Sequence, residues 1–306
     1  MDNICCIILN YNDASTAVGL VRELERSRVL SDIVVVDNHS TDDSWQRLGV
    51  FKGREIRRAD GLVPVHLMRT EKNNGYGMGN QAGIHYAMEY LSPDYIIIAN
   101  PDIHVTDSCI RQVKEALEKD EKGALASAMV VSPEGRALFS YWDLLPLWKE
   151  LLDTGLITRR LFRGSLTTPV SSLSLAEDGE NRLVGALPGS FFMVKTGCFT
   201  PQEMDSLFDE GVFLYCEEKI LGQKLKRKGL RAILVTDAFY VHAHSVSIDK
   251  SLTSIGDKQK LLHESKLYYY KNYLHAGPWK MAAVRAFLAV VLAEVRFLTG
   301  VLRMRW

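Results

Sequence analysis

Five short segments of almost unbroken apolar character constrain the fold most strongly. Such segments are typical of strands covered on both faces, as in a parallel sheet, rather than of half-exposed strands. The first four are separated by segments that can form helices, so the pattern predicts an α/β fold with crossover helices. The segments are residues 4–9, 33–36, 63–68, 95–99 and 124–131.

Length and charge limit the classes of protein that remain. With 306 residues, 47% of them hydrophobic, the chain can bury a large core and form one α/β domain with additions. Lys plus Arg and Asp plus Glu both number 37, so no overall charge recruits nucleic acid. The first apolar segment is too short for a signal peptide. The five cysteines form no CxxC pair, which favours a reducing cytoplasm over a disulfide framework or a zinc site.

Polar clusters directly follow three of the predicted strands. Ligands of parallel sheets gather at the carboxyl ends of the strands, so residues 10–13, 37–42 and 100–102 are candidates for a binding site. Asp37 can accept hydrogen bonds from a nucleobase or a ribose, although a turn with a helix N-cap explains the same residues. Asp102 is a suitable oxygen ligand for Mg²⁺ or Mn²⁺ beside a substrate diphosphate, or the segment merely ends the strand.

Two further segments carry candidate site residues. Residues 73–83 are rich in glycine, which lets a backbone approach a ligand, but they match neither the Walker pattern nor GxGxxG. Within them, Asn80 is unfavourable in a helix unless its side chain is engaged. Glu217 and Glu218 stand where an aromatic segment becomes a helix that Gly229 ends. Such carboxylates are either ordinary helix-start charges or a half-buried general base.

Seven motifs, in this order, resemble one family. They are IILNYND, VVVDNHSTDDS, NNGYGMGNQAG, IIIANPDI, GALPGSFFMVKTGCF, FDEGVFLYCEE and YVHAHSVS, between about residues 3 and 247. Together they resemble the family 2 glycosyltransferases, particularly the branch with bacterial rhamnosyltransferases of surface polysaccharide assembly. The resemblance implies a GT-A fold, which is Rossmann-like with a mixed, mostly parallel sheet flanked by helices. It also implies a nucleotide-diphospho-sugar donor, a divalent metal and inversion at the anomeric carbon.

The resemblance assigns roles to individual residues. Asp102 matches the metal-binding aspartate of a DxD-like element, which reads Asn-Pro-Asp here, and the metal is Mg²⁺ or Mn²⁺. His242 matches a histidine that contacts the diphosphate or the metal, and His244 is a nearby alternative. Gly189 and Ser190 match the acceptor side, where an ordinary turn into a strand is the other interpretation. The nucleotide and donor side comprises Asn10, Tyr11, Asn12, Asp37, Asn38, Ser40, Asn74, Gly75, Asn80, Asn100 and Asp102.

The resemblance also implies a catalytic base, which lies in the acidic pair Glu217-Glu218. In the family this pair is Glu-Asp and its second member is the base, which corresponds to Glu218, with Glu217 as its neighbour. We expect partial burial to raise the pKa of Glu218 toward the working range of a base. Ile220 and Lys224 stand where relatives commonly have aspartate and arginine. Either the backbone retracts slightly to fit the longer glutamate, or the acceptor site is built differently.

The resemblance thus implies an inverting, metal-dependent glycosyltransferase. Its expected donor is dTDP-rhamnose, with a UDP-hexose second, and its expected acceptor is a polyprenyl-diphosphate-linked saccharide in O-antigen or capsule synthesis. A catalytically inactive nucleotide-sugar-binding or scaffold protein of the same fold is the alternative. A sugar-nucleotide pyrophosphorylase is disfavoured because residues 10–13 replace the glycine-rich, arginine-containing loop of that class.

One segment fits the series of motifs poorly. Residues 143–181 combine an apolar patch with Arg159, Arg160 and Arg163, which suits an acceptor-binding insertion, a mobile lid or a core helix. The predicted parts of the chain are a GT-A domain at 1–250, with a nucleotide-binding half at about 1–132 and an acceptor half at about 133–250, and a helical extension at 251–306.

The C-terminal segment is predicted to lie on a membrane surface. Residues 278–306 read as an apolar helix, but the longest uncharged run, residues 286–293, is too short to span a bilayer. Arg285, Arg296 and Arg303 form a basic stripe that suits an anionic membrane. A homodimer interface is the alternative. The expected location is the cytoplasm, peripheral to the inner face of the plasma membrane.

Overall fold

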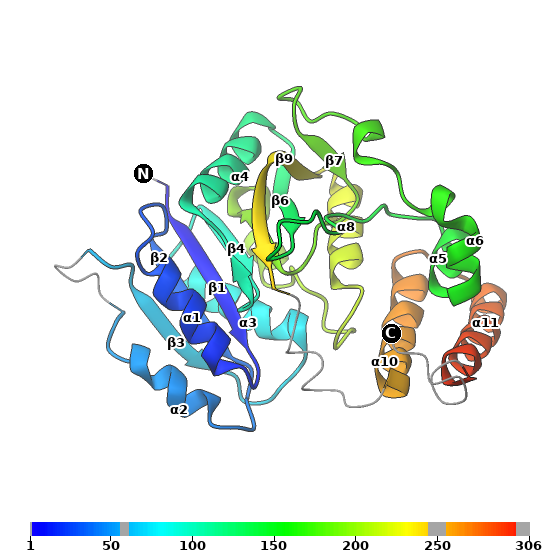
Figure 1. The fold of residues 1–306 in the computed structure, drawn as a ribbon, viewed down its shortest axis with the longest axis horizontal. Coiled ribbons are helices and arrows are strands. Elements are labelled where there is room, and N and C mark those ends of the chain that lie inside the picture. Colours follow the sequence, from blue (N-terminus) through cyan, green and yellow to red (C-terminus); the bar gives the residue numbers. More distant parts are fainter. Residues whose placement is uncertain (1, 56–60, 244–254, 298–306) are drawn as a thin grey trace.

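A nine-stranded sheet forms the body of the protein, and a lobe of helices lies beside it (Figure 1). The structure is a computed structural model, and it describes residues 2–55, 61–243 and 255–297. In chain order the elements are β1 (Ile4–Asn10), α1 (Ala14–Leu24), β2 (Asp32–Asp37), α2 (Ser44–Leu48), η1 (Gly49–Phe51), β3 (Val65–Arg69), α3 (Tyr76–Tyr90), β4 (Tyr95–Ala99), β5 (Ile103–His104), α4 (Asp107–Lys119), β6 (Gly123–Val131), α5 (Leu147–Thr154), α6 (Leu156–Leu166), η2 (Val170–Ser172), β7 (Arg182–Val184), β8 (Phe191–Lys195), η3 (Thr196–Cys198), α7 (Pro201–Met204), α8 (Glu217–Lys228), β9 (Arg231–His242), α10 (Ile255–Asn272) and α11 (Pro278–Arg296).

The N-terminal half of the sheet is parallel and covered on both faces. β1 lies between β2 and β4, and β3 pairs with β2. Side chains of these strands alternate between two buried layers, one under α1, α2 and α4 and the other under α3, α7 and α8. This double coverage explains why the strands read as unbroken apolar segments, and it confirms the predicted α/β fold.

The register of the first three strands aligns polar side chains at one edge of the sheet. Asn10 ends β1 and lies opposite Asp37, which ends β2. Asp37 in turn lies opposite Arg69, which ends β3. Parallel strands bring their carboxyl ends to the same edge, so the three side chains are neighbours there.

The C-terminal half makes the sheet mixed. β8 runs antiparallel between β4 and β6, while β9 runs parallel to β6. The short strands β5 and β7 both pair antiparallel with β9. The β5–β9 pair places Ile103 opposite His242, so the residue after Asp102 lies beside the end of β9. The full strand order is β3-β2-β1-β4-β8-β6-β9-β5, with β7 beside β9.

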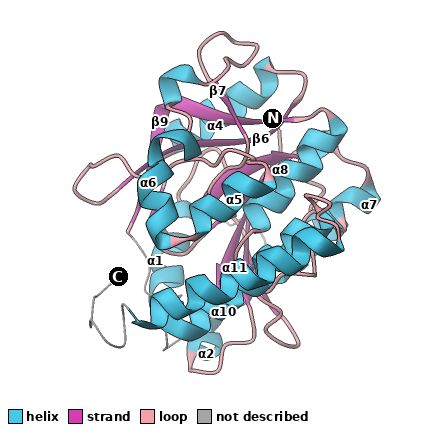
Figure 2. Cartoon of the chain, turned by 90° about the vertical axis from the view of Figure 1, so that its right-hand side faces the viewer, coloured by secondary structure: helices cyan, strands magenta, loops and turns pink. Residues whose placement is uncertain are grey.

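The lobe consists of the helices α5, α6, α10 and α11. In Figure 2 the molecule is turned so that this lobe faces the viewer. Its core contains Tyr269 and Tyr270 of α10, which are fully buried, and Met281 and Val284 of α11. Ile220 of α8 belongs to the same cluster. The lobe therefore shares a hydrophobic core with the helix that carries the acidic pair.

Hydrogen bonds tie α10 to the loop that leads into α8. Tyr268 Oη donates to Asp209 Oδ1 at 2.8 Å. Ser265 Oγ donates to the carbonyl oxygen of Leu214 at 2.6 Å. The helix α10 thus holds the loop directly before the acidic pair in place.

Most of α6 faces away from the core. Leu161 is 74% exposed and Phe162 is 45% exposed. Arg159, Arg160 and Arg163 on the same helix are exposed as well. A core helix was one interpretation of this segment, and it is wrong for α6, whose apolar side chains mostly lie on the surface.

The helix α11 buries one face and exposes the other. Met281 and Val284 point into the lobe, whereas Arg285 and Arg296 are exposed. Arg303, the third residue of the predicted basic stripe, lies outside the described residues. Within the three described ranges, no helix combines the length and apolarity needed to cross a membrane.

Candidate active site

Asp37 is the centre of a hydrogen-bonded cluster at the carboxyl ends of β1, β2 and β3. Its Oδ1 accepts hydrogen bonds from Asn10 Nδ2 at 3.0 Å and from Ser40 Oγ at 2.5 Å. Its Oδ2 forms an ion pair with Arg69 Nε at 3.0 Å, and the carboxylate has no exposed surface. In this arrangement the carboxylate orients its three neighbours. The sequence analysis missed Arg69, although a basic residue that ends the third apolar segment was an available signal.

Asn12 and Asn38 join neighbouring loops at the same edge. Asn12 has a φ of 53°, and its Oδ1 accepts a hydrogen bond from Thr41 N at 2.8 Å. Asn38 Nδ2 donates to the carbonyl oxygen of Gly75 at 3.0 Å. Tyr11, next to Asn12 in the chain, is partly exposed. Three of the predicted polar segments therefore come together, one after β1, one after β2 and one at the start of α3.

The glycine-rich segment packs closely against the loop before α8 at Gly75. Gly75 has a φ of 92°, and a Cβ there would lie 1.9 Å from the carbonyl oxygen of Phe213. The Tyr76 amide donates to that oxygen at 3.0 Å. Asn80 is fully buried and its Nδ2 donates to Tyr76 O at 3.0 Å, so its side chain is engaged by its own helix. Asn74 is exposed and lines a separate cavity of about 510 Å³.

The candidate metal ligands Asp102 and His242 are in contact. Asp102 Oδ1 lies 3.3 Å from His242 Nε2, and Asp102 is 9% exposed. A carboxylate and an imidazole can hold a divalent ion that takes its other ligands from water and a diphosphate. His244 lies outside the described residues. Among the residues that the structure describes, no group of three or more His, Cys, Asp or Glu side chains could hold a metal ion.

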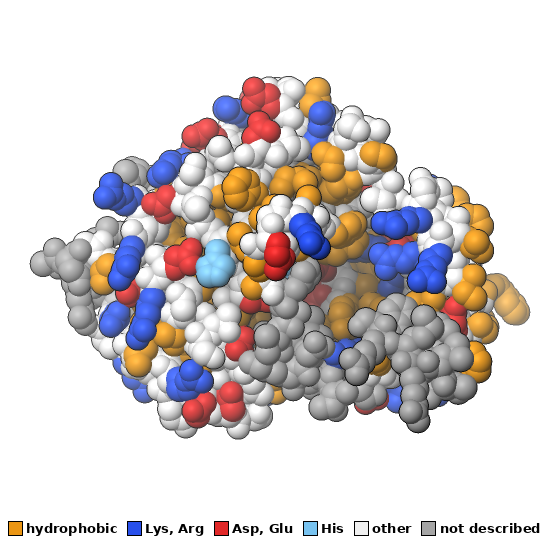
Figure 3. All heavy atoms as spheres, viewed as in Figure 1, with side chains coloured by type: hydrophobic (Ala, Val, Ile, Leu, Met, Phe, Trp, Pro, Cys, Tyr) orange, Lys and Arg blue, Asp and Glu red, His pale blue; other side chains and the backbone are white. Residues whose placement is uncertain are grey.

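A cavity of about 1010 Å³ lies between the sheet and the lobe. In the space-filling view the surface is hollowed at this place, and Lys and Arg side chains gather on the lobe (Figure 3). The described residues around Asp37 do not line it. The predicted site residues in its wall are Asn100, Gly189, Ser190, Glu217, Glu218 and His242. Catalytic, acceptor-side and metal-side candidates therefore meet in one cavity.

The acidic pair opens α8 after an unusual backbone turn. Tyr215 and Cys216 have φ values of 74° and 71°, a left-handed conformation that non-glycine residues adopt mainly at functional or strained sites. Glu217 is 4% exposed, and burial together with the charge of Glu218 raises its pKa to about 8. Burial also raises the pKa of Glu218, although its own amide and that of Gly189 donate hydrogen bonds that partly offset this. The predicted direction of the Glu218 pKa is therefore confirmed.

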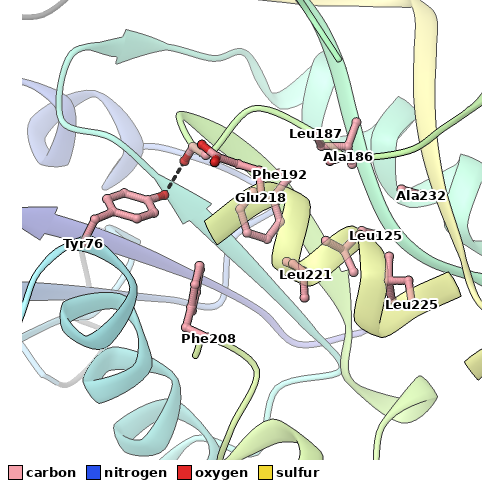
Figure 4. Close-up of a pocket in the computed structure, with 12 residues that line it drawn as sticks. Tyr76, Leu125, Ala186, Leu187, Phe192, Phe208, Glu218, Leu221, Leu225 and Ala232 are labelled. Carbon is pink, nitrogen blue, oxygen red and sulfur yellow. Dashed lines mark hydrogen bonds between the residues drawn. The ribbon is translucent and has the colours of Figure 1, made fainter. Parts of the chain in front are cut away.

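Gly189 connects the acidic pair to the start of α3. Tyr76 Oη donates to the carbonyl oxygen of Gly189 at 2.5 Å (Figure 4), and the Gly189 amide is one of the groups that lower the pKa of Glu218. A Cβ at Gly189 would lie 3.0 Å from both Glu218 Oε1 and Tyr76 Oη. Burial raises the pKa of Tyr76 well above its ordinary value, so its hydroxyl stays neutral and can donate. The sequence analysis missed Tyr76 because its partner is distant in the chain.

Ile220 and Lys224, the two departures from the resemblance, lie away from the cavity. Ile220 is 1% exposed and packs in the core of the lobe. Lys224 Nζ donates to the carbonyl oxygens of Ser206 and Leu207 at 2.7 and 3.1 Å. Both side chains thus have structural partners in this chain.

Two curated relatives resemble most of the chain. The N-acetylglucosaminyl-diphospho-decaprenol L-rhamnosyltransferase of Mycobacterium tuberculosis (strain ATCC 25618 / H37Rv) is 25% identical over 259 residues, covering 81% of this chain and 76% of the relative. The low-salt glycan biosynthesis hexosyltransferase Agl10 of Haloferax volcanii is 24% identical over 232 residues. That match covers 75% of this chain, which spans only 64% of the archaeal protein.

Two solved structures share the fold. GalNAc-T7 with UDP, GalNAc and Mn²⁺ aligns with a TM-score of 0.57 and 16% identity, covering 90% of this chain and 50% of the other. The mannosyltransferase PcManGT from Pyrobaculum calidifontis, in complex with GDP-Man and Mn²⁺, aligns with a TM-score of 0.55 and 14% identity, covering 97% and 80%. At these identities the likeness concerns the fold, and both neighbours agree with the predicted GT-A architecture.

The N-terminal half of the chain identifies the family. Residues 5–170 match the model of glycosyl transferase family 2. This range covers the strands β1 to β6, whose ends carry the Asp37 cluster and Asp102. It covers more than half of the chain, and the rhamnosyltransferase and hexosyltransferase relatives agree with it. The protein therefore belongs to glycosyl transferase family 2 and resembles its bacterial rhamnosyltransferases.

Proposed function

We propose that the protein transfers a sugar, with inversion, from a nucleotide-diphospho-sugar to a saccharide carried on a polyprenyl diphosphate. One observation carries the proposal: Glu218 and His242 line the same cavity, and His242 contacts Asp102. A base and a diphosphate-binding group are thus available on two sides of one space. The name of the mycobacterial relative supports rhamnose as the sugar, with dTDP-rhamnose the first donor and a UDP-hexose the second. The pathway would be O-antigen or capsule synthesis.

Glu218 acts as the base in this proposal. Its carboxylate takes the proton of the acceptor hydroxyl while the hydroxyl oxygen attacks the anomeric carbon from the face opposite the diphosphate. The new bond joins this carbon to the acceptor oxygen, the bond to the diphosphate oxygen breaks, and the configuration inverts. A raised pKa favours this role because it makes Glu218 a stronger base than an exposed carboxylate.

Asp102 and His242 bind the leaving group in this proposal. They would hold Mg²⁺ or Mn²⁺, which supplies positive charge for the departing diphosphate. Two structural neighbours contain Mn²⁺, which supports a divalent ion in this fold. Asn100 holds the neighbouring loop, because its backbone amide donates to the carbonyl oxygen of Ser190 at 2.8 Å. This bond fixes the metal side against the acceptor side.

The donor nucleotide would lie at the carboxyl ends of β1 to β3. Asp37 there orients Asn10, Ser40 and Arg69 through buried hydrogen bonds and an ion pair. Asn12 and Tyr11 lie in the next loop. We propose the division made from the sequence for the whole chain: a donor half at about 1–132, an acceptor half at about 133–250 and a helical part at 251–306.

The lobe would attach the enzyme to the inner face of the plasma membrane. α6 exposes Leu161 and Phe162 beside three arginines, and α11 exposes Arg285 and Arg296. α6 and α11 contact each other, so both surfaces belong to one lobe. Exposed apolar residues beside basic ones suit an anionic membrane, where a lipid-linked acceptor is found. Sedimentation with phosphatidylglycerol vesicles, but not with phosphatidylcholine vesicles, is expected. A concentration-dependent dimer without vesicle binding would favour the homodimer alternative.

Thermal stabilisation by nucleotide sugars tests the donor site. A ligand that binds only the folded protein raises its melting temperature, so dTDP-rhamnose or a UDP-hexose with Mn²⁺ should do so. Transfer is then measured with a polyprenyl-diphosphate-linked N-acetylglucosamine. Absence of any shift across a donor panel contradicts the proposal. Binding without transfer to any acceptor would favour the catalytically inactive scaffold.

A further inference from the structure

Lys266 is a buried cation on the lobe side of the large cavity. It belongs to α10, lines the cavity and is only 8% exposed. Its Nζ donates to Thr154 Oγ1 of α5 at 2.6 Å. That hydroxyl carries no charge, and Lys266 forms no ion pair with any carboxylate in the part of the chain that the structure describes.

The carboxylate of the neighbouring helix α5 already has a partner. Glu150 Oε1 accepts from Lys219 Nζ at 2.6 Å, and 1% of the Glu150 side chain is exposed. Two other titratable groups near Lys266, His263 and Cys216, are neutral near pH 7. Burial, with the charge of Lys266, lowers the pKa of His263 to about 4, and burial raises that of the Cys216 thiol to about 12. Among the described residues, therefore, Glu150 pairs with Lys219 and no carboxylate pairs with Lys266.

An uncompensated ammonium group in a protein interior is costly. Burial removes the water that stabilises the charge, and a hydrogen bond to a neutral hydroxyl restores only part of this stabilisation. A ligand that brings negative charge into the cavity recovers this free energy on binding. Lys266 therefore favours an anionic ligand over a neutral one of the same size.

We propose that Lys266 binds a phosphate of the acceptor, so that the enzyme recognises its acceptor as a phosphorylated, lipid-linked saccharide. This inference rests on the proposed function. Glu218 lines the same cavity and would face the acceptor hydroxyl, while Asp102 and His242 keep the donor diphosphate at the sheet. The acceptor phosphate thus has a separate cation, supplied by the lobe.

The same cavity provides the apolar surface that such an acceptor needs. Leu156 of α6 and Ile255 and Leu262 of α10 contribute to its wall. Lys258 of α10 adds a second cation on the same side. A diphosphate followed by an isoprenoid chain matches this combination of cations and aliphatic side chains.

Binding of farnesyl diphosphate without metal tests the inference directly. EDTA is present, so that a metal-bound diphosphate at Asp102 cannot contribute. We expect farnesyl diphosphate to raise the melting temperature of the wild type, farnesol to have no effect, and Lys266→Gln to weaken the apparent Kd about tenfold. Lys260→Gln is the matched control, because Lys260 lies on the same helix but is exposed and pairs with Asp257 at 3.4 Å. Equal binding to wild type and Lys266→Gln overturns the inference.

Transfer kinetics distinguish the acceptor from the donor. Lys266→Gln should raise the acceptor KM about tenfold for a diphosphate-linked saccharide, with the donor KM unchanged and no effect on a neutral alkyl glycoside acceptor. Lys266→Arg, which keeps the charge, should recover most of the loss. A raised donor KM, or equal losses with both acceptors, overturns the inference in favour of a donor or structural role. If the wild type binds farnesyl diphosphate but transfers no sugar, the proposed function fails while the anion site stands.

Discussion

Tyr76 Oη lies 2.5 Å from the carbonyl oxygen of Gly189, the residue whose amide, in the preceding peptide, donates to Glu218. The two bonds run through one residue and link the first turn of α3 to the carboxyl of Glu218. Neither α8 nor the loop before β8 fixes this position alone. The site is therefore sensitive to small changes at Gly189.

Gly189→Ala should reduce turnover with little loss of stability. The added Cβ would lie 3.0 Å from Glu218 Oε1 and from Tyr76 Oη, so one of them must move. A displaced catalytic group can lower kcat by about tenfold to a hundredfold, while the free energy of unfolding should change by less than about 1 kcal/mol. Gly197→Ala is the control, because nothing lies within 4 Å of a Cβ there. Unchanged kcat in Gly189→Ala would show that the glycine does not position the base.

Glu218→Gln should abolish transfer while donor binding remains. Loss of a general base costs about 10²–10⁴-fold in kcat, and the amide preserves the shape of the side chain. Glu217→Gln should lower kcat by a smaller factor, because Glu217, with a pKa of about 8, is already protonated near neutral pH. The measurements are kcat and the donor-induced shift in melting temperature. The assignment is reversed if Glu217→Gln is the inactive variant.

Glu217 makes the protein less stable as the pH rises. Its pKa is about 8 in the folded protein and about 4.5 when exposed, so between these values the unfolded chain releases a proton that the folded chain retains. The free energy of unfolding should therefore fall from about pH 4.5 and level off above pH 8. Glu217→Gln should flatten this slope and stabilise the protein by on the order of 5 kcal/mol at pH 8.5. Urea unfolding at several pH values measures both effects, and parallel curves for the two proteins would contradict them.

Much of the sheet follows from the sequence, whereas much of the site does not. The unbroken apolar segments predicted the parallel strands, because a strand covered on both faces has no polar side. Asp37 and Asp102 follow two of these strands, so a local pattern was enough to select them. The contact between Asp102 and His242 depends on the pairing of β5 with β9, which no local pattern contains.

The contacts that complete the cavity join residues far apart in the chain. Tyr76 and Gly189 are separated by 113 residues, and Lys266 and Thr154 by 112. The residues around Tyr76 predict only the start of a helix, and those around Lys266 predict only an amphipathic helix. The left-handed backbone at Cys216 is equally hidden, because glycine or asparagine would be the usual signal for it. Tertiary packing determines these features.

Gly75→Ala should strongly destabilise the fold. The residue has a φ of 92°, and its Cβ would lie 1.9 Å from the carbonyl oxygen of Phe213, in the loop before α8. Backbone strain and the clash together should lower the free energy of unfolding by about 3 kcal/mol or more. Gly53→Ala separates the two causes, because Gly53 has a φ of 76° with open space around it and should cost only about 1–2 kcal/mol. Equal losses in the two variants would mean that strain alone matters.

Asp102→Asn and His242→Gln should both weaken the effect of Mn²⁺ on donor binding. Asp102 Oδ1 and His242 Nε2 lie 3.3 Å apart, so a divalent ion that joined them would replace their direct contact. With Mn²⁺ the donor should raise the melting temperature of the wild type more than without it, and each variant should lose most of this difference. His85→Gln is the control, because His85 is exposed and contacts Asp205 at 3.8 Å. Full Mn²⁺ dependence in Asp102→Asn would remove the metal assignment. Loss of turnover in Glu218→Gln, with turnover retained in Asp102→Asn, would leave a metal-independent transferase that uses the same base.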